Sequence, residues 1–279
     1  MNGKPVSRIT GAALLGGIVG YPVSHSLSPV IHNAWLEAGG IDAAYAAFAP
    51  RDAAGFEALV AAGRAGLIAG VNVTAPFKEQ AFALADEAGA AARLTGSANI
   101  LVFEEGRVWA ESADGAGVLY ALAEQAPGLK LNGASVVILG AGGAARAGAG
   151  AMIEAGAALS ILNRTRERAE ALAADLGPAV SVAPDAGVLE DADLVINALS
   201  VAPDIALETL KPSAVVMDMT YKPVVTPLLA AARARGLTVV DGLAMLIGQA
   251  TPSFEAIFRR PPPPLDLRAL LLAHLGEAV

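Results

Sequence analysis

The chain carries the sequence SVVILGAGGAA at Ser135–Ala145. Its β-branched and aliphatic run up to Leu139 is typical of a strand that is buried on both faces of a parallel sheet. The following Gly140–Ala145 fits the pattern G-x-G-x-x-A, in which the first glycine permits a tight turn and the second lets the backbone approach a pyrophosphate. In an Ala- and Gly-rich chain this string alone is a weak signal and fits an ordinary glycine turn as well. Its strand–turn–helix context predicts a Rossmann-type dinucleotide site, with the helix amino terminus facing the phosphates.

A basic segment further along the chain indicates which dinucleotide is bound. Asn163–Arg168 reads NRTRER, at the position where an acidic residue would bind the ribose of NAD and an arginine would accommodate the 2′-phosphate of NADP. A guanidinium can bind phosphate through two hydrogen bonds and stack on an adenine. We therefore expect NADP, bound by Arg164 and Arg168. The alternative is a solvated helix start at which Arg166 and Arg168 face water.

Composition limits the classes of function. The 279 residues (28.0 kDa) are 54% hydrophobic and 16% charged, with a mean hydropathy of +0.53, which excludes disorder. Apolar runs are too short for a spanning helix, and the weak signal-peptide pattern at 4–19 lacks a cleavage site. The net charge of −8 disfavours nucleic acid. The chain has no cysteine and three scattered histidines, so we expect no metal. The short apolar runs indicate no membrane, and the lack of cysteine fits a cytoplasmic location.

Alternating apolar segments predict an α/β fold with parallel strands. Expected strands are 14–19, 44–48, 68–73, 99–103, 107–110, 135–139, 159–162, 194–197, 215–217 and 238–240. Expected helices are 52–62, 166–176, 227–235, 243–258 and 265–275, with one more after the glycine turn. Two further helices are expected to begin at Ser28, acting as the N-cap before Pro29, and at Pro76.

Lys78 is the most conspicuous of the five lysines. The segment Gly70–Lys78 predicts a strand that ends near Asn72 and Thr74, followed by a helix with Lys78 in its first turn. A cation there is disfavoured by the helix dipole. Such a lysine suits proton chemistry with a lowered pKa, although an ordinary surface lysine fits the passage equally well.

Several motifs recur in a fixed order, and together they resemble the shikimate dehydrogenase family from Gly20 to about Phe254. The motifs are GYPVSHSLSP at 20–29 with His32-Asn33, NVTAPFK at 72–78, GSAN at 96–99, Asp114-Gly115, the glycine turn, Asn163-Arg164-Thr165, DMTY at 218–221 with Pro223, Thr226 and Pro227, and Asp241-Gly242-Leu243 with Met245, Leu246 and Gln249. Each motif is modest, but the ordered series is specific.

The resemblance implies two α/β domains that flank an interdomain cleft. It implies a substrate-binding domain at 1–114 and 243–279, and a Rossmann-type NADP-binding domain at 115–242. It implies an NADP-dependent reduction of 3-dehydroshikimate to shikimate, in aromatic amino-acid (chorismate) biosynthesis, with Lys78 and Asp114 as the catalytic pair. The implied substrate-binding residues are Ser26, Ser28, Asn72, Thr74, Asn99, Tyr221 and Gln249. The implied cofactor-binding residues are Gly140, Ala141, Gly142, Gly143, Ala144, Asn163, Arg164, Thr165, Arg168, Met219 and Gly242.

Some positions depart from the family pattern or allow another interpretation. The usual Asn-Thr before the catalytic aspartate is Ser112-Ala113, the usual Asn-Ala-Thr-Ser is Asn197–Ser200 with leucine third, and the following Gly-Met is lost at Ala202-Pro203. Ser28 could be only an N-cap, Tyr221 a core tyrosine, and His25 a structural residue. The alternatives are a quinate/shikimate dehydrogenase with relaxed choice of substrate or cofactor, a weakly catalytic ligand-binding or regulatory relative, and, less favoured, a folate-linked dehydrogenase. We expect a monomer or homodimer.

Overall fold

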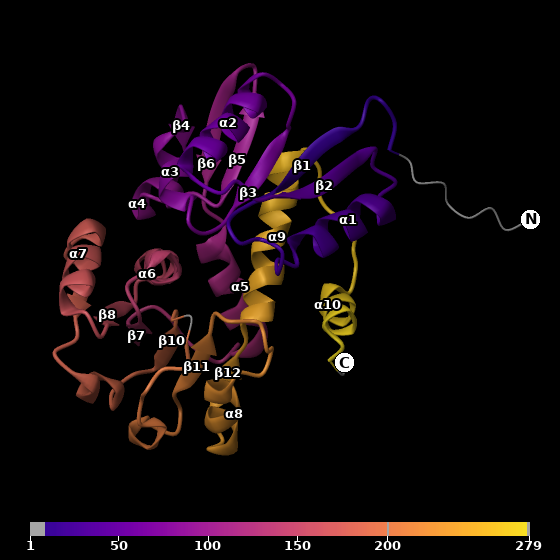
Figure 1. Ribbon diagram of the computed structural model, residues 1–279. Coiled ribbons are helices and arrows are strands. Elements are labelled where there is room, and N and C mark those ends of the chain that lie inside the picture. The colour runs from indigo at the N-terminus through magenta and orange to yellow at the C-terminus, as the bar shows by residue number, and fades with distance from the viewer. Residues whose placement is uncertain (1–8, 200, 278–279) are drawn as a thin grey trace, which may run out of the picture. The chain divides into compact units, whose positions relative to one another are not determined.

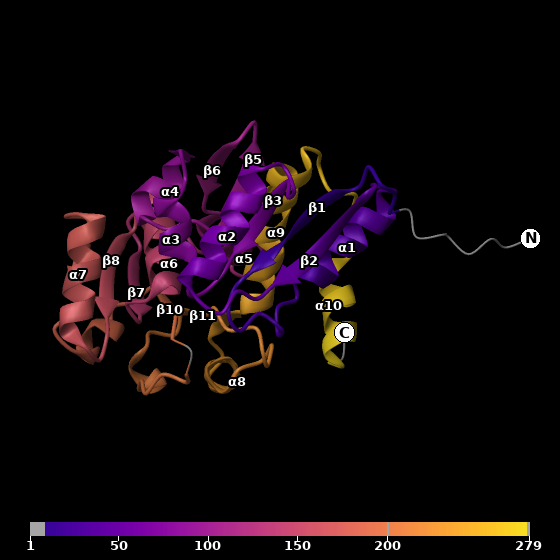
Figure 2. The same ribbon diagram turned by 45° about the horizontal axis from the view of Figure 1, so that its top comes forward.

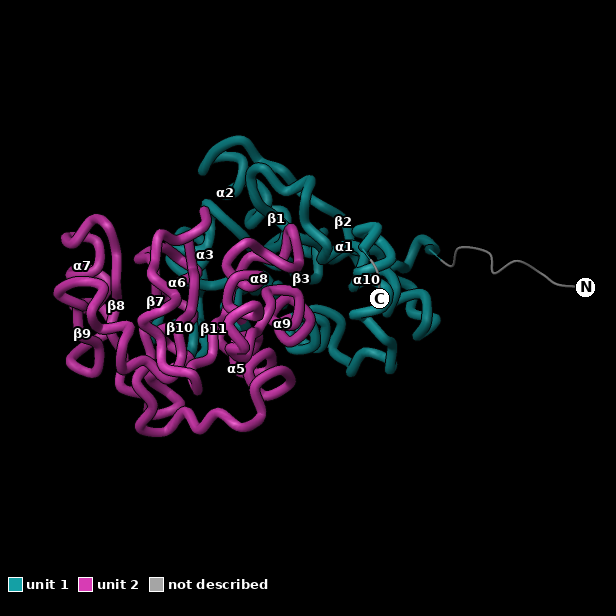
Figure 3. Tube along the Cα trace, turned by 90° about the horizontal axis from the view of Figure 1, so that it is seen from below, with its two compact units in different colours: residues 1–113, 250–279 teal, residues 114–249 magenta. Residues whose placement is uncertain are grey.

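The computed structural model describes residues 9–199 and 201–277 (Figure 1). The chain divides into two compact units, which are coloured separately in Figure 3. Unit 1 comprises residues 1–113 and 250–279, and unit 2 comprises residues 114–249. One division falls just before helix α5 (Asp114–Gln125), and the other falls within helix α9 (Gly242–Phe258). Unit 2 is thus inserted into the sequence of unit 1.

Unit 1 is built on a mixed sheet with the strand order β2-β1-β3-β5-β6-β4. The strands are β1 (Leu14–Val19), β2 (Ala43–Phe48), β3 (Gly70–Val73), β4 (Glu87–Ala88), β5 (Ile100–Glu104) and β6 (Arg107–Glu111). β1 pairs in parallel with β2 and β3, whereas β5 runs antiparallel to β3 and β6. The helices are α1 (Ser28–Ala38), α2 (Ala53–Arg64), α3 (Lys78–Ala83), α4 (Ala90–Thr95) and α10 (Leu267–Leu275), and α1 lies beside β2 (Figure 2).

The core of unit 1 follows the alternation of its strands. In β5, Leu101 and Phe103 join a buried cluster that contains Phe56 of α2. The intervening Ile100 and Val102 join another cluster. Because successive side chains of a strand point to opposite faces, the central strands of unit 1 are covered on both sides.

Unit 2 has an all-parallel sheet with the order β12-β11-β10-β7-β8-β9. The strands are β7 (Ser135–Leu139), β8 (Ala158–Leu162), β9 (Val180–Val182), β10 (Leu194–Asn197), β11 (Val215–Asp218) and β12 (Thr238–Val240). The further helices are α6 (Gly143–Glu154), α7 (Arg166–Leu176) and α8 (Pro227–Ala234), with short 3-10 turns η1 (Ala186–Leu189) and η2 (Leu207–Thr209). The chain proceeds outward from β7 in both directions, as in a doubly wound Rossmann fold.

The central strand β7 is buried on both faces, as its sequence predicts. Val136 and Ile138 belong to one core cluster, whereas Val137 and Leu139 belong to another. The two-unit α/β fold with a Rossmann-type sheet is therefore confirmed. In the described part of the chain, no helix is both long and apolar enough to cross a membrane.

Helix starts differ from the expectations at two places. α1 begins at Ser28 itself, with Leu27 as its N-cap, so the prediction that Ser28 is the N-cap is wrong. The helix expected to open at Pro76 begins two residues later, at Lys78. Four elements were not predicted from the sequence: β4, α4, α5 and β9. The first two contain only two and six residues, too few for a periodic pattern.

Candidate functional site

Asn72 of β3 is the centre of a buried polar network in unit 1. Its Oδ1 accepts a hydrogen bond of 2.7 Å from the hydroxyl of Tyr45. Its Nδ2 donates to the hydroxyl of Ser253 at 2.8 Å and to the carbonyl of Asn99 at 3.2 Å. Asn72, Asn99 and Ser253 are all buried. Burial makes each of these bonds structurally important, because an unsatisfied polar group in a core is costly.

Ser26 and Ser28, two of the three serines of the GYPVSHSLSP motif, connect to this network. The hydroxyl of Ser26 accepts from the backbone N–H of Ser28 at 3.2 Å. The side chain of Ser28 hydrogen-bonds with Tyr45, and this bond opposes the burial that raises the pKa of Tyr45. Tyr45 therefore stays a neutral hydroxyl that can donate to Asn72. Ser26 and Ser28 are both half-buried, so their hydroxyls lie at the boundary between the core and the surface of unit 1.

His32 lies on the other side of Tyr45. The two rings are stacked, with centroids 4.2 Å apart and planes 4° apart. The imidazole is 1% exposed, and within the described residues its Nδ1 has no hydrogen-bond partner. Burial lowers the pKa of His32 to about 3, so the ring is neutral. Tyr45 and Ser253 were not predicted as site residues, and His32 stands in the first motif with no role predicted for it.

Three other predicted residues occupy the same edge of the sheet of unit 1. Thr74 follows the carboxyl end of β3, and Asn99 precedes the amino end of β5. Since β3 and β5 are antiparallel, these two ends meet at one edge. Asn99 is held by a 2.8 Å bond from the N–H of Ala113 to its Oδ1. Lys78 is half-buried at the start of α3, and its carbonyl accepts from the N–H of Ala98 at 3.0 Å.

The remaining predicted substrate and catalytic residues belong to unit 2. Asp114 is the first residue of α5 and is buried. Tyr221 and Gln249 are half-buried; Tyr221 follows β11, and Gln249 lies in α9. The predicted meeting of Lys78 with Asp114, Tyr221 and Gln249 joins residues of different units, and it stays a prediction.

The glycine turn of unit 2 leaves the amino end of α6 open. Gly140 has φ +112°, a conformation that residues with a side chain rarely adopt, and a Cβ there would lie 3.1 Å from Leu199. At Gly142, the N-cap of α6, an added Cβ would meet no atom of the described residues within 4 Å, and the same holds at Gly143. The fold itself therefore has no steric need for these two glycines. Open backbone amides at a helix amino terminus are suited to binding an anion.

The basic segment after β8 lies mostly at the surface. Asn163 shapes the turn, since its Nδ2 donates to the carbonyl of Thr165 at 2.7 Å. Arg166 is engaged by Glu170, with Nε and Oε1 2.8 Å apart. Arg164 and Arg168 are exposed, and within the described ranges neither forms an ion pair. Arg164 and Arg168, and not Arg166, are thus the arginines with guanidinium groups available to a phosphate.

The two residues expected beside the nicotinamide are Met219, which follows β11, and Gly242, the first residue of α9. Asp218 accepts from Asn197 Nδ2 at 3.1 Å and from the Thr226 hydroxyl at 2.7 Å, which fixes the turn that follows. Met219 comes next, and a Cβ on Gly242 would lie 2.5 Å from its carbonyl oxygen. Met219 and Gly242 are therefore in contact. No cluster of His, Cys, Asp or Glu suited to a metal ion occurs within residues 9–199 and 201–277.

Unit 2 has a glycine turn after the central strand of a parallel sheet, and unit 1 carries a lysine and several hydroxyl and amide groups. This combination defines a two-domain dehydrogenase of the Rossmann class. Family models agree with this assignment. The shikimate dehydrogenase substrate-binding domain matches residues 18–101, and the shikimate/quinate 5-dehydrogenase domain matches residues 121–223. The chain belongs to the shikimate dehydrogenase family, and the resemblance seen in its motifs is confirmed.

Individual relatives support the same family. The chain is 50% identical to the shikimate dehydrogenase (NADP(+)) of Caulobacter vibrioides over 97% of this chain and 99% of the relative. Its identity to that of Maricaulis maris is 44%, covering 96% and 98%. Among solved structures, shikimate 5-dehydrogenase from Thermus thermophilus in complex with NADP(H) and shikimate has a TM-score of 0.81 at 34% identity, covering 90% and 95%. Quinate dehydrogenase from Corynebacterium glutamicum with NAD has a TM-score of 0.85 at 28% identity, covering 94% and 99%.

Proposed function

We propose that this chain is an NADP-dependent oxidoreductase that reversibly reduces 3-dehydroshikimate to shikimate, in the biosynthesis of chorismate and the aromatic amino acids. The observation that carries the proposal is its 50% identity, over 97% of its length, to a shikimate dehydrogenase (NADP(+)). Such an enzyme needs an anion-binding turn, which the open amino end of α6 supplies. It also needs polar groups for the substrate, which unit 1 supplies where the carboxyl end of β3 meets the amino end of β5. In this proposal most substrate-binding residues belong to unit 1, and the NADP-binding residues belong to unit 2.

Substrate recognition is assigned to neutral hydrogen-bonding groups. Ser26 and Tyr221 donate to the substrate carboxylate, and Ser28 joins them when its hydroxyl turns from Tyr45 to the substrate. Thr74, Asn99 and Gln249 bind the ring hydroxyls. Asn72 has a narrower role, because both hydrogens of its Nδ2 are engaged inside unit 1. Its free capacity is the second lone pair of Oδ1, which can accept from a ring hydroxyl.

Lys78 and Asp114 are assigned to the reacting hydroxyl. When bound, NADPH supplies the hydride that reaches the ketone carbon. The Lys78 ammonium gives its proton to the oxygen on that carbon, where its positive charge also stabilises the developing alkoxide. Asp114 accepts a hydrogen bond from the lysine or from a neighbouring hydroxyl and orients both. In the reverse direction, neutral Lys78 takes the proton back.

The cofactor is assigned to groups of unit 2. The pyrophosphate binds the amides of Gly140–Ala144 at the start of α6, where the backbone can be approached closely. Arg164 and Arg168 bind the 2′-phosphate of NADP, supported by Asn163 and Thr165, while Met219 and Gly242 adjoin the nicotinamide. The cytoplasmic location and the monomeric or dimeric state expected from the sequence are part of the same proposal.

The test is a spectrophotometric assay of the purified protein with shikimate or quinate and with NADP or NAD. We expect NADP reduction with shikimate to be the fastest of the four combinations. Lys78→Ala should lower kcat at least about a hundredfold with little change in the Kd for NADP, whereas Lys130→Ala, in an exposed loop of unit 2, should behave as the wild type. The proposal is wrong if shikimate with NADP gives no turnover at saturation.

A further inference from the structure

The helix that carries Lys78 is too short to hold its own position. α3 contains six residues and follows Phe77 as its N-cap, a side chain that cannot accept a hydrogen bond from the helix amides. Isolated helices of this length are unstable in water, so tertiary contacts decide where α3 lies. The position of Lys78 therefore depends on the groups that hold the two ends of α3.

Helix α2 holds the first turn of α3. Phe77, just before Lys78, stacks on Phe56 of α2 with ring centroids 4.9 Å apart and planes 1° apart. Gln80 Nε2 donates to Glu57 Oε1 at 3.0 Å and to the carbonyl of Ala53 at 3.3 Å. These contacts fix the amino end of α3 sideways against α2. The other end of α3 requires a separate attachment.

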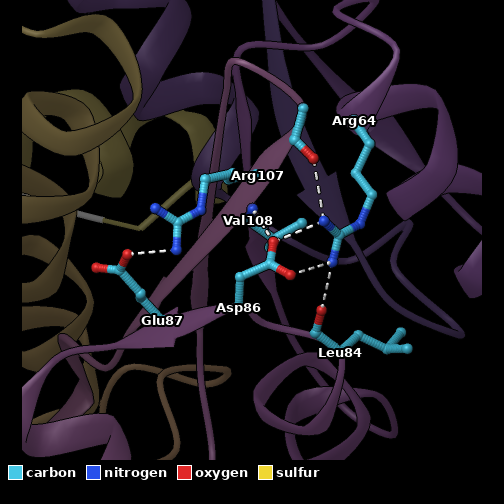
Figure 4. Close-up of polar contacts among 7 residues, drawn as sticks. Arg64, Leu84, Asp86, Glu87, Arg107 and Val108 are labelled. Carbon is cyan, nitrogen blue, oxygen red and sulfur yellow. Dashed lines mark hydrogen bonds and ion pairs between the residues drawn. The ribbon is translucent and has the colours of Figure 1, made fainter.

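Arg64, the last residue of α2, provides this attachment (Figure 4). Its Nη2 donates to the carbonyl of Leu84, the C-cap residue of α3, at 3.0 Å and to Asp86 Oδ1 at 3.1 Å. Its Nη1 donates to Asp86 Oδ2 at 2.6 Å and to the carbonyl of Gly106 at 3.0 Å. Both hydrogens of both terminal nitrogens are used. A cation on the carbonyl at a helix carboxyl end is favourable.

Asp86 is itself fixed, so Arg64 is not a free surface arginine. Asp86 Oδ2 also accepts from the N–H of Val108 at 2.7 Å, and the Asp86 N–H donates to the Val108 carbonyl at 2.9 Å. Arg64 and its bonds lower the pKa of Asp86, which keeps that carboxylate charged. The guanidinium thus links the end of α3 to the β5–β6 hairpin at Gly106 and Val108. Only a planar, forked donor can satisfy these acceptors together.

We propose that Arg64 is a positioning residue for Lys78: it fixes the carboxyl end of α3 and thereby the placement of the lysine at its first position. This inference rests on the proposed catalytic role of Lys78. Proton transfer is sensitive to misplacement, and an error of about 1 Å can lower the rate by about a hundredfold. Loss of the Arg64 attachment should loosen the carboxyl end of α3, whose amino end is still held by α2 and by the bond from the Ala98 N–H to the Lys78 carbonyl. The serine and asparagine groups that bind the substrate should not be displaced.

The test compares Arg64→Met with Arg107→Met. Arg107 is a matched control, because its guanidinium binds Glu87 at 2.6 Å on the neighbouring strands and, within the described residues, has no bond to α3. Shikimate-binding sites are counted by calorimetric titration, and kcat is expressed per site. For Arg64→Met we expect kcat per site to fall about tenfold and the Kd for shikimate to stay within about twofold. Arg107→Met should match the wild type.

A purely structural role of Arg64 would reduce the number of binding sites and leave kcat per site unchanged, and that result would overturn the proposal. Arg64→Lys should restore kcat only in part, since one ammonium cannot reach all the acceptors. If Arg64→Met does not fold, Arg64→Lys decides: lowered kcat per site with unchanged Kd supports the proposal, and unchanged kcat refutes it. A Lys78→Ala variant with full turnover would instead show that the proposed function of Lys78 is wrong.

Discussion

Acid should destabilise this protein through one buried imidazole. Burial lowers the pKa of His32 to about 3 in the folded chain, against 6.5 for a free histidine. Above pH 6.5 the ring is neutral in both states and has no effect on the pH dependence of stability. Below pH 6.5 the unfolded chain binds a proton that the folded chain does not, so the free energy of unfolding falls as the pH falls, down to about pH 3. The folded chain does not bind this proton because a charged imidazole in a core of aromatic rings costs free energy.

The size of the effect follows from the two pKa values. Each unit of pKa difference corresponds to about 1.4 kcal/mol. Between pH 7 and pH 5 the unfolded state gains most of a proton, so His32 should remove about 2 kcal/mol of stability. Because the folded pKa lies far below 5, the folded state takes up almost no proton in this range. Tyr45, the titratable group stacked on the ring, stays neutral, since burial raises its pKa.

The assay is urea unfolding of the wild type and of His32→Phe at pH 7 and pH 5. The phenyl ring keeps the aromatic packing with Tyr45, Trp35 and Phe254 and cannot titrate. The stability lost between the two pH values should be about 2 kcal/mol smaller in the variant. The control is His274→Gln, at an exposed position near the end of α10. This variant keeps the buried imidazole of His32 and should lose as much stability as the wild type between the two pH values. Equal losses in the wild type and His32→Phe would refute the reasoning.

Two further predictions concern the cofactor site. Gly142→Ala should leave the melting temperature of the free protein unchanged, because the added methyl group meets no described atom within 4 Å. The same variant should raise the Kd for NADP at least about tenfold, because the methyl group faces the open helix terminus. Gly140→Ala should lower the free energy of unfolding by about 1–2 kcal/mol, since the φ of Gly140 is +112°. The reasoning assigns Gly140 to stability and Gly142 to cofactor binding. It would be contradicted by wild-type stability of Gly140→Ala or by wild-type NADP affinity of Gly142→Ala. Arg164→Gln should weaken NADP binding about tenfold more than NAD binding, measured by fluorescence titration. Arg166→Gln, which loses only the pair with Glu170, is the control, and equal losses for both cofactors would show that Arg164 does not bind the 2′-phosphate.

The fold of unit 2 could be predicted because its central strands are unambiguous in the sequence, whereas the three-residue edge strand β9 was missed. A strand buried on both faces reads as a continuous apolar run, and 135–139 and 194–197 match β7 and β10 residue for residue. α5 was missed for a tertiary reason. It contains Gly117, where a Cβ would lie 2.5 Å from the carbonyl of Met245. Close packing of two helices demands a glycine there, although glycine weakens a helical pattern.

The site could be predicted only where a motif marks it. Ser26, Asn72 and Lys78 stand in recognisable strings, and each has a definite place in unit 1. The partners that hold them have no such signal. Tyr45 and Ser253 reach Asn72 across 27 and 181 residues of sequence. No local periodicity connects positions so far apart, so hydrogen bonds of this kind become visible only in three dimensions.

The error at Ser28 clarifies how the network of unit 1 is arranged. Had Ser28 been the N-cap of α1, its hydroxyl would have been used by the amides of that helix. Because Leu27 takes that position, the hydroxyl of Ser28 is bonded to Tyr45 instead. Tyr45 in turn is fixed by the stacked ring of His32 and donates to Asn72. A charged His32 would disturb the same tyrosine that orients Ser28 and Asn72, so the neutrality of one core histidine sustains both the stability of unit 1 and the order of its polar groups.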